Sequence, residues 1–368
     1  MPPLTTLLGI FAPAIMAVTA VPQPGELKVF KDWVVGCDNG GDCQAVSLVP
    51  EQGGGGFDHW NGPVTIVRTA GMDDGLKVRI LFQSKDIDRY KMTVDGKLVD
   101  TGPIVEGDYP IEIVGEDAKK VAQAIKRGNR LKISGPGNEK LTQISLAGSS
   151  AALRYMDARQ KRTGTRTALV AKGRKKFAPL KAAAPLYSVD QWDKSEMTPE
   201  ADEIVALVES SQCKDARYGV TEDQAYPMGK RDGKYRALVL VSCGSGAYNF
   251  SSTAFIGEYV EAGDDSKGWT FEPARFDMPP GWGGDGGTSL LVNAYWDETD
   301  QILGSYAKGR GLGDCGSSES YVWDGQMFRL IEASSMNECR GAYQWITTWR
   351  ANYHKVEEPP EQTVAADQ

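Results

Sequence analysis

The chain has few of the residues on which catalytic and metal centres usually depend. Its 368 residues include only two histidines, His59 and His354, and no C-x-x-C pair. A zinc or iron site needs several histidine or cysteine ligands at close spacing, so we expect no metal site and no cofactor. The sequence also lacks a G-x-S-x-G motif, which disfavours Ser-His-Asp or Cys-His catalysis.

Basic residues are also fewer than acidic ones, with 41 Lys and Arg against 49 Asp and Glu. The formal net charge is −8 at pH 7, which disfavours a nucleic-acid-binding protein. One local exception runs from Arg154 to Lys176, where nine Lys or Arg residues accompany a single acid, Asp157. We interpret this stretch as a solvated helix face followed by a lysine-rich loop, with contact to anionic lipid, peptidoglycan or nucleic acid as the alternative. No aromatic platforms interleave with the charges, which weakens the nucleic-acid alternative.

Long apolar runs are missing outside the first twenty residues. Residues 1–20 carry no charged side chain and end in Val18-Thr19-Ala20, small residues typical of a signal-peptide cleavage site. The run is short for a membrane span and contains Pro13. We therefore expect a secretory signal, a mature protein that begins at Val21, a periplasmic location and no membrane span after the signal is removed.

Six cysteines follow this segment, and an even count behind an export signal predicts disulfides. Six thiols allow about 15 connectivities. We favour sequential pairing because each pair then brackets one local strand-and-turn region: Cys37 with Cys43, Cys213 with Cys243, and Cys315 with Cys339.

The pattern of strands and turns predicts a mainly β protein of two domains. An N-terminal β-sandwich-like domain spans residues 24–177 and includes a hairpin at 28–50, a helix at Glu116–Arg127 and a helix capped by Ser149 or Ser150. Residues 178–198, rich in proline and alanine, are interpreted as a linker. A glycine- and tryptophan-rich antiparallel β domain spans residues 199–355, and residues 356–368 are expected to be a disordered tail.

The C-terminal domain is expected to open with a helix that has Thr198 as N-cap and Pro199 in its first turn. Four apolar residues of this helix would form its buried face: Ile204, Val205, Leu207 and Val208. The helix would end at Cys213. Strands are predicted at residues 235–241, 252–260, 269–271, 290–296 and 302–308, and Trp323-Asp324-Gly325 predicts a hairpin with a type I′ turn.

The main candidate for a binding site is the stretch Lys308–Gly316, which has four glycines in nine residues. Gly311, Gly313 and Gly316 match the dinucleotide motif G-x-G-x-x-G, but the residues that follow predict a strand where the motif needs a helix. The candidate binding residues are Lys308, Arg310, Asp314, Arg340, Tyr248, Asn249 and Trp323. In the alternative interpretation, Asp314 accepts loop N–H groups and the arginines cap carbonyl groups.

Several separate stretches carry a resemblance to a known family. They are DWVVGCDNGGDCQA, LRYMDARQKRTGTRTALVAKG, SCGSGAYNF, YAKGRGLGDCG with YVWDGQMFRL, and ECRG with ITTWRA. Together they resemble the DUF1176 family of exported bacterial proteins, known for six cysteines. The N-terminal part begins with Trp33, Cys37 and Cys43 and has a Leu-x-Gly…Ala-Leu helix from Leu146 to Leu153. With these features it is also similar to the invasion-associated locus B family, which implies a periplasmic β-sandwich with one or two helices. Neither resemblance brings a biochemical activity or catalytic residues.

Three functions of different classes remain open. The first is a non-catalytic envelope protein that binds another macromolecule, protein or glycan, or contributes to wall integrity. The second is a glycan hydrolase that uses two carboxylates about 5–10 Å apart, drawn from Asp285, Asp297, Asp314 and Glu338. The third is an inhibitor that presents the Lys308–Gly316 loop to an exogenous enzyme such as a lysozyme.

Overall fold

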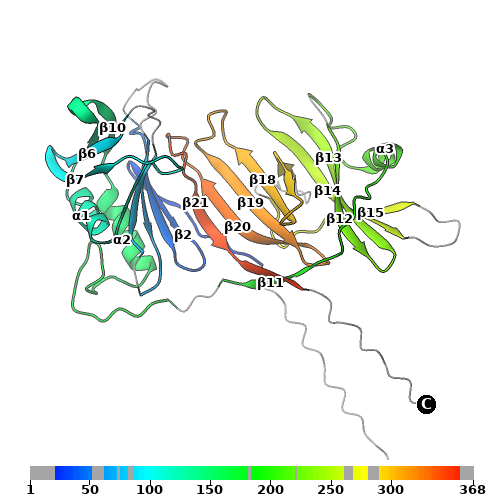
Figure 1. The fold of residues 1–368 in the computed structure, drawn as a ribbon, viewed down its shortest axis with the longest axis horizontal. Helices are drawn as coiled ribbons and strands as arrows, with labels where there is room; N and C mark the ends of the chain where they lie inside the picture. The colour runs from blue at the N-terminus through cyan, green and yellow to red at the C-terminus, as the bar shows by residue number, and fades with distance from the viewer. Residues whose placement is uncertain are drawn as a thin grey trace, which may run out of the picture.

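The fold is described from a computed structural model, which covers residues 21–51, 62–72, 75–81, 87–180, 184–219, 222–260, 268–280 and 290–356. Within these ranges the chain forms 22 β-strands and three α-helices, so it is mainly β, as the sequence predicts. The sheets follow one another along an elongated molecule, with α1 and α2 at one end and α3 at the other (Figure 1).

The first sheet has six antiparallel strands in the order β1-β2-β3-β4-β5-β8. These strands are β1 (Lys28–Phe30), β2 (Trp33–Cys37), β3 (Cys43–Ser47), β4 (Val64–Arg68), β5 (Lys77–Ile80) and β8 (Ile111–Val114). The predicted hairpin is confirmed, because β2 pairs with β3 and Cys37 lies opposite Cys43. Every residue of β2 is buried, which requires that both faces of this sheet be covered.

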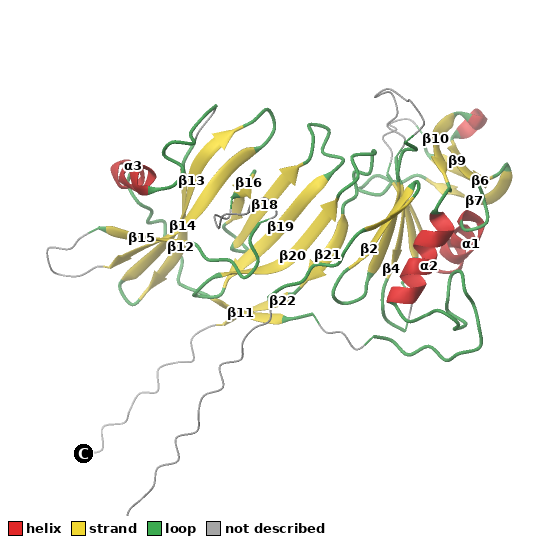
Figure 2. Ribbon diagram, turned by 180° about the vertical axis from the view of Figure 1, so that it is seen from behind, coloured by secondary structure: helices red, strands yellow, loops and turns green. Residues whose placement is uncertain are grey.

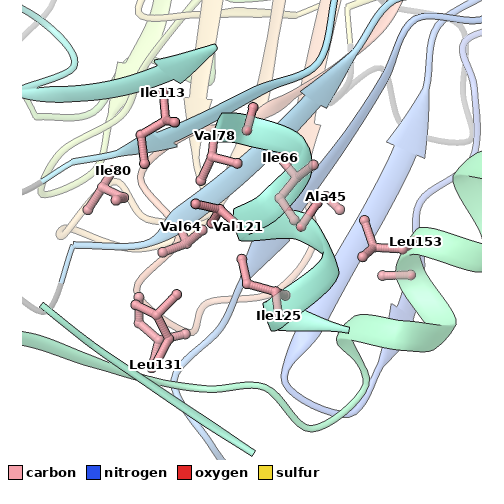
Figure 3. Close-up of a cluster of buried hydrophobic side chains, with 14 of the residues drawn as sticks. Ala45, Val64, Ile66, Val78, Ile80, Ile113, Val121, Ile125, Leu131 and Leu153 are labelled. Atoms are coloured by element: carbon pink, nitrogen blue, oxygen red, sulfur yellow. The ribbon is translucent and has the colours of Figure 1, made fainter. Parts of the chain in front are cut away.

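A second sheet and two helices share a core with one face of the first sheet. The second sheet has the order β10-β9-β6-β7, and its strands are β6 (Arg89–Val94), β7 (Lys97–Pro103), β9 (Arg130–Ser134) and β10 (Lys140–Ser145), with a 3₁₀ turn at Pro136–Asn138. Figure 3 shows Val121 and Ile125 of α1 (Gly115–Ile125) and Leu153 of α2 (Ser149–Arg159) among the side chains of this core.

The predicted serine cap of α2 is wrong. Gly148, at φ 95°, precedes the helix, and no side chain caps it. The Ser149 hydroxyl instead donates a hydrogen bond of 3.1 Å to the Ile125 carbonyl oxygen at the end of α1. Leu153 and Met156 of this helix are buried.

Two further sheets pack face to face in the second half of the chain. One has the order β12-β13-β14-β15, with β16 beside β14, and the other has the order β17-β18-β19-β20-β21. Their strands are β12 (Gln224–Arg231), β13 (Lys234–Ser245), β14 (Phe250–Val260), β15 (Trp269–Pro273), β16 (Leu291–Val292), β17 (Tyr295–Asp297), β18 (Ile302–Lys308), β19 (Gly316–Trp323), β20 (Phe328–Met336) and β21 (Ile346–Arg350). The strand predicted at 290–296 is divided between β16 and β17, because Asn293 takes φ 45° between them.

Four local predictions in this half need correction. The turn after Trp323 is longer than a two-residue type I′ turn: Trp323 pairs with Phe328, and the Asp324 carboxylate accepts the N–H groups of Gln326 and Met327. Helix α3 (Ala201–Ser210) starts after the predicted Thr198 cap, because Glu200 forms a capping box with Glu203. Its buried face excludes Val205, which is 61% exposed. The helix also ends at Ser210, short of Cys213, the residue at which it was predicted to end.

The stretch predicted as a linker contains a strand. β11 (Leu186–Asp190) pairs in parallel with β22 (Asn352–Val356), so the chain segment before α3 is joined to its far end. Tyr187 and Val189 of β11 pack on Val322 and Ile331 of the β17–β21 sheet. Residues 186–190 are therefore part of the folded body.

The two halves of the molecule also share a hydrophobic core. Figures 1 and 2 both show β21 beside β2, and the apolar residues at this junction are Val34, Val46, Leu48, Cys315, Met336, Ala342 and Ile346. This junction covers the second face of β2 and β3. The three predicted disulfides are all present: Cys37–Cys43, Cys213–Cys243 and Cys315–Cys339.

Candidate functional site

The Lys308–Gly316 loop connects β18 to β19 and is closed on itself. The Gly309 N–H donates to the Cys315 carbonyl oxygen at 2.8 Å, and the Gly313 N–H donates to the Arg310 carbonyl oxygen at 3.0 Å. Gly316 has φ 145°, and a Cβ atom there would lie 2.0 Å from the Ala307 carbonyl oxygen. Only glycine fits that position, and the adjacent Cys315–Cys339 disulfide fixes the loop to the segment after β20.

The glycine spacing in this loop has a structural explanation. A strand, β19, starts at Gly316, the third glycine of the G-x-G-x-x-G pattern. A dinucleotide site would place a helix N-terminus there to receive the phosphates. The loop is therefore a hairpin connection between two antiparallel strands, in which Lys308 pairs with Gly316.

Asp314 and Arg310 form the centre of the loop. The Asp314 side chain is fully buried, and it accepts hydrogen bonds from Arg310 Nε at 2.7 Å, from Arg310 Nη2 and from the Gly341 N–H. Burial raises the pKa of Asp314, but the hydrogen bonds from Arg310 and Gly341 more than offset this, and the pKa lies below its ordinary value. The carboxylate stays ionised, which suits a structural acceptor.

Arg340 follows the disulfide and points across the junction between the two halves. Its guanidinium donates to the Val49 carbonyl at 2.7 Å, to the Lys31 carbonyl at 3.0 Å and to the Asp32 carboxylate at 2.8 Å. Only 12% of its side chain is exposed. Arg340 thus caps carbonyl groups, as the alternative interpretation expected, and it connects β20–β21 to the β1–β3 region.

Asn249 connects the loop to the neighbouring sheet. Its side-chain amide donates to the Lys308 carbonyl oxygen at 2.9 Å, and its amide oxygen accepts the Lys308 N–H at 3.2 Å. Asn293 continues this network, since its amide donates to Asn249 at 3.0 Å and to the Tyr306 carbonyl at 2.8 Å. The Tyr248 ring lies next to Gly311.

The structure thus brings six of the seven predicted residues to one corner and leaves Trp323 apart. Trp323 stands at the other end of β19, is buried, and packs edge-on against Phe328 with ring centroids 5.1 Å apart. Its role is to fill the core between the two C-terminal sheets.

Three aromatic side chains near the loop were not predicted from the sequence as part of the site: Tyr306, Tyr343 and Trp345. Tyr306 of β18 stacks on Trp345 with ring centroids 4.5 Å apart and an interplanar angle of 5°. Tyr343 lies near the ion pair, and its pKa is raised by burial and by the Asp314 carboxylate. Tyr306 is half-buried between two buried residues of β18, Ser305 and Ala307. Trp345 lies in irregular structure, so no strand or helix periodicity in the sequence indicates its position.

The acids proposed for a hydrolase have different partners, although Asp314 and Glu338 both lie next to the Cys315–Cys339 disulfide. Asp314 is held by Arg310, Asp297 accepts the N–H groups of Thr299 and Asp300 in an exposed turn, and Glu338 lies 3.9 Å from Arg340. Asp285 and His59 lie outside the described residues.

The described ranges contain no group of three or more His, Cys, Asp or Glu side chains placed to hold a metal ion. His354 is on β22, with its Nε2 atom 3.4 Å from the Ser188 hydroxyl. No helix in the described part of the chain is both long enough and apolar enough to cross a membrane.

The fold and its cross-linked corner define a disulfide-containing, mainly β protein whose two halves share a core. The chain belongs to the family described as "Protein of unknown function (DUF1176)", whose profile matches residues 27–352. It is similar to the uncharacterised protein YpfG of Escherichia coli (strain K12), with 28% identity over 358 residues, which cover 92% of this chain and 97% of YpfG. No solved structure matches the chain significantly.

Proposed function

We propose that this chain is an exported protein of the periplasm that binds another envelope macromolecule, a protein or a glycan, without catalysing a reaction. Two features support export. Residues 1–20 have the composition of a secretory signal, and all six cysteines are paired, as expected in an oxidising compartment.

The observation that carries the binding proposal is the combination of a fixed base and an exposed tip in the Lys308–Gly316 loop. The base is held by the Cys315–Cys339 disulfide and the Arg310–Asp314 ion pair. At the tip, Leu312 is 43% exposed, and Phe250, next to Asn249, is 47% exposed. A surface that is ordered before binding loses little conformational entropy on association.

The two predicted domains, residues 24–177 and 199–355, are proposed to act as one body. The apolar junction and the Arg340 contacts support this proposal. The Lys308–Gly316 loop therefore has a fixed orientation relative to the N-terminal sheets.

A photo-crosslinking amino acid at position 312 tests the binding proposal in cells that make this protein. Leu98, on β7, is 61% exposed and far from the loop in sequence, and it supplies the matched control position. We expect a discrete cross-linked adduct from position 312 and none from position 98. Equal behaviour at both positions would contradict a binding edge at this loop.

The same fixed loop also suits an inhibitor of an exogenous enzyme such as lysozyme. Titration of lysozyme with the purified protein separates the two functions. An inhibitor reduces turnover in proportion to its concentration, whereas a protein that binds an envelope component leaves turnover unchanged.

A further inference from the structure

A second surface, on the opposite half of the molecule, carries an unbalanced positive charge. It comprises the end of α2 and the loop that follows it, which lie beside α1 at the end of the molecule (Figure 2). Eight exposed cations form this basic surface: Arg154, Arg159, Lys161, Arg166, Lys172, Arg174, Lys175 and Lys176. The rest of the chain is acidic enough to give a net charge of −8.

The one acid of this stretch does not balance these charges. Asp157 is completely buried and pairs with Arg68 at 2.9 Å. Its two oxygens also accept the N–H groups of Leu169 and Val170 at 2.8 and 2.9 Å. Its role is to hold the loop against the C-terminal end of β4, where Arg68 lies.

The ninth cation, Arg162, is also buried and fixes the loop from inside. It donates to the Gly71 carbonyl at 2.6 Å and to the Gln160 side chain at 3.2 Å, and it lies 3.8 Å from the centre of the Phe177 ring. Backbone hydrogen bonds from the Gly164 N–H to Ala171 and from the Lys175 N–H to Gly164 close the loop on itself. The backbone that carries the exposed cations is therefore held in a fixed conformation.

This arrangement keeps like charges together. Within the described ranges, none of the eight exposed cations forms an ion pair with an acid at 4.0 Å or less. At the end of α1, Lys126 donates to the Leu169 carbonyl, and its pKa is lowered by burial and by the nearby Arg127 and Lys172. Clustered like charge destabilises a folded protein unless an opposite charge approaches from outside.

We propose that this basic surface binds the surface of an anionic phospholipid bilayer through its headgroup phosphates. The exposed large apolar residues of the described chain all lie outside residues 154–176, so nothing there is suited to insert between acyl chains. Tyr155 packs on Phe30, and Arg162 covers Phe177, so neither ring offers a platform for nucleic-acid bases. Many fixed cations without apolar or aromatic anchors suit adsorption to a broad phosphate surface.

The test is sedimentation of the full chain with vesicles. One preparation is phosphatidylcholine alone, and the other contains phosphatidylglycerol as well. The test variant replaces four cations by Glu: Arg166, Lys172, Arg174 and Lys176. The matched control replaces four exposed lysines elsewhere by Glu, with the same change in net charge: Lys91, Lys97, Lys140 and Lys234. All proteins share residues 1–20, so differences between variants are independent of that segment.

The parent and the control are expected to bind the anionic vesicles better than the neutral ones, with binding that weakens as salt rises. Each cation near an anionic surface strengthens binding about fivefold. If two of the four replaced cations contact headgroups, the test variant should bind about 25-fold more weakly. A second variant with Gln at the same four positions should also lose binding, which guards against misfolding of the Glu variant.

Three outcomes overturn the proposal. They are a parent that shows no preference for phosphatidylglycerol, a control that loses as much binding as the test variant, and a parent that binds duplex DNA more tightly than anionic vesicles. The last result would assign the surface to nucleic acid.

Discussion

The buried pair of Arg68 and Asp157 gives the largest stability effect that we predict. Both side chains are 0% exposed, and the Asp157 carboxylate also holds two backbone N–H groups of the following loop. Asp157→Ala would leave the Arg68 charge buried without its carboxylate. Such a change costs about 3–5 kcal/mol, which corresponds to a melting temperature lower by about 6–20 °C.

Calorimetric melting of the parent and variants measures this effect. Asp117→Ala on α1 is the matched control, because that carboxylate is 60% exposed, and it should melt within about 2 °C of the parent. The double variant Arg68→Met/Asp157→Ala also removes the buried guanidinium charge, so it should recover part of the lost melting temperature. The predicted role of the buried pair is contradicted if Asp157→Ala melts like the control, or if the double variant is no more stable than Asp157→Ala alone.

Three further predictions concern covalent structure, processing and pH. Non-reducing peptide mapping should give the local cross-links Cys37–Cys43, Cys213–Cys243 and Cys315–Cys339, and a peptide joining different pairs would contradict this connectivity. Protein recovered from the periplasm should begin at or near Val21, and an intact Met1 would argue against signal cleavage. The Asp314 pKa is lowered in the folded state, so its stabilisation is present above about pH 4 and is lost as the pH falls through the folded pKa. The difference in stability between the parent and Asp314→Asn should therefore shrink in acid, and a difference that is constant with pH would show that the charge is irrelevant.

The sequence predicts the features that depend on near neighbours in the chain. The hairpin at residues 28–50 is predicted from its turn and its two cysteines, and β2 pairs with β3 with Cys37 opposite Cys43. Helix α1 follows from its apolar spacing. The local cysteine pairs follow from the strands and turns that they bracket.

Contacts between distant segments could not be predicted in the same way. β11 was interpreted as linker because its partner, β22, lies far along the chain: Leu186 pairs with Asn352. Arg340 was taken as a binding residue, yet it contacts Val49, which is 291 positions away. Val205 was placed in the core because its neighbours are apolar, but its position around the helix turns it to solvent.

The final prediction concerns Arg310, at the centre of the Lys308–Gly316 loop. Its side chain is 40% exposed, and this alone would suggest a free tip for binding. However, Arg310 holds the buried Asp314 carboxylate through two nitrogens, and Asp314 in turn accepts the Gly341 N–H beyond the disulfide.

Arg310→Ala therefore leaves a buried carboxylate with one donor fewer on each oxygen. The expected cost is about 1–3 kcal/mol, towards the lower end because water can reach the vacated side of the pair. A drop of several degrees in melting temperature would identify Arg310 as part of the loop's framework, whereas Leu312→Ala, at the exposed tip, should melt like the parent. An Arg310→Ala variant that melts like the parent but loses the cross-linked adduct at position 312 would reverse this assignment. It would make the guanidinium itself the group that meets the partner.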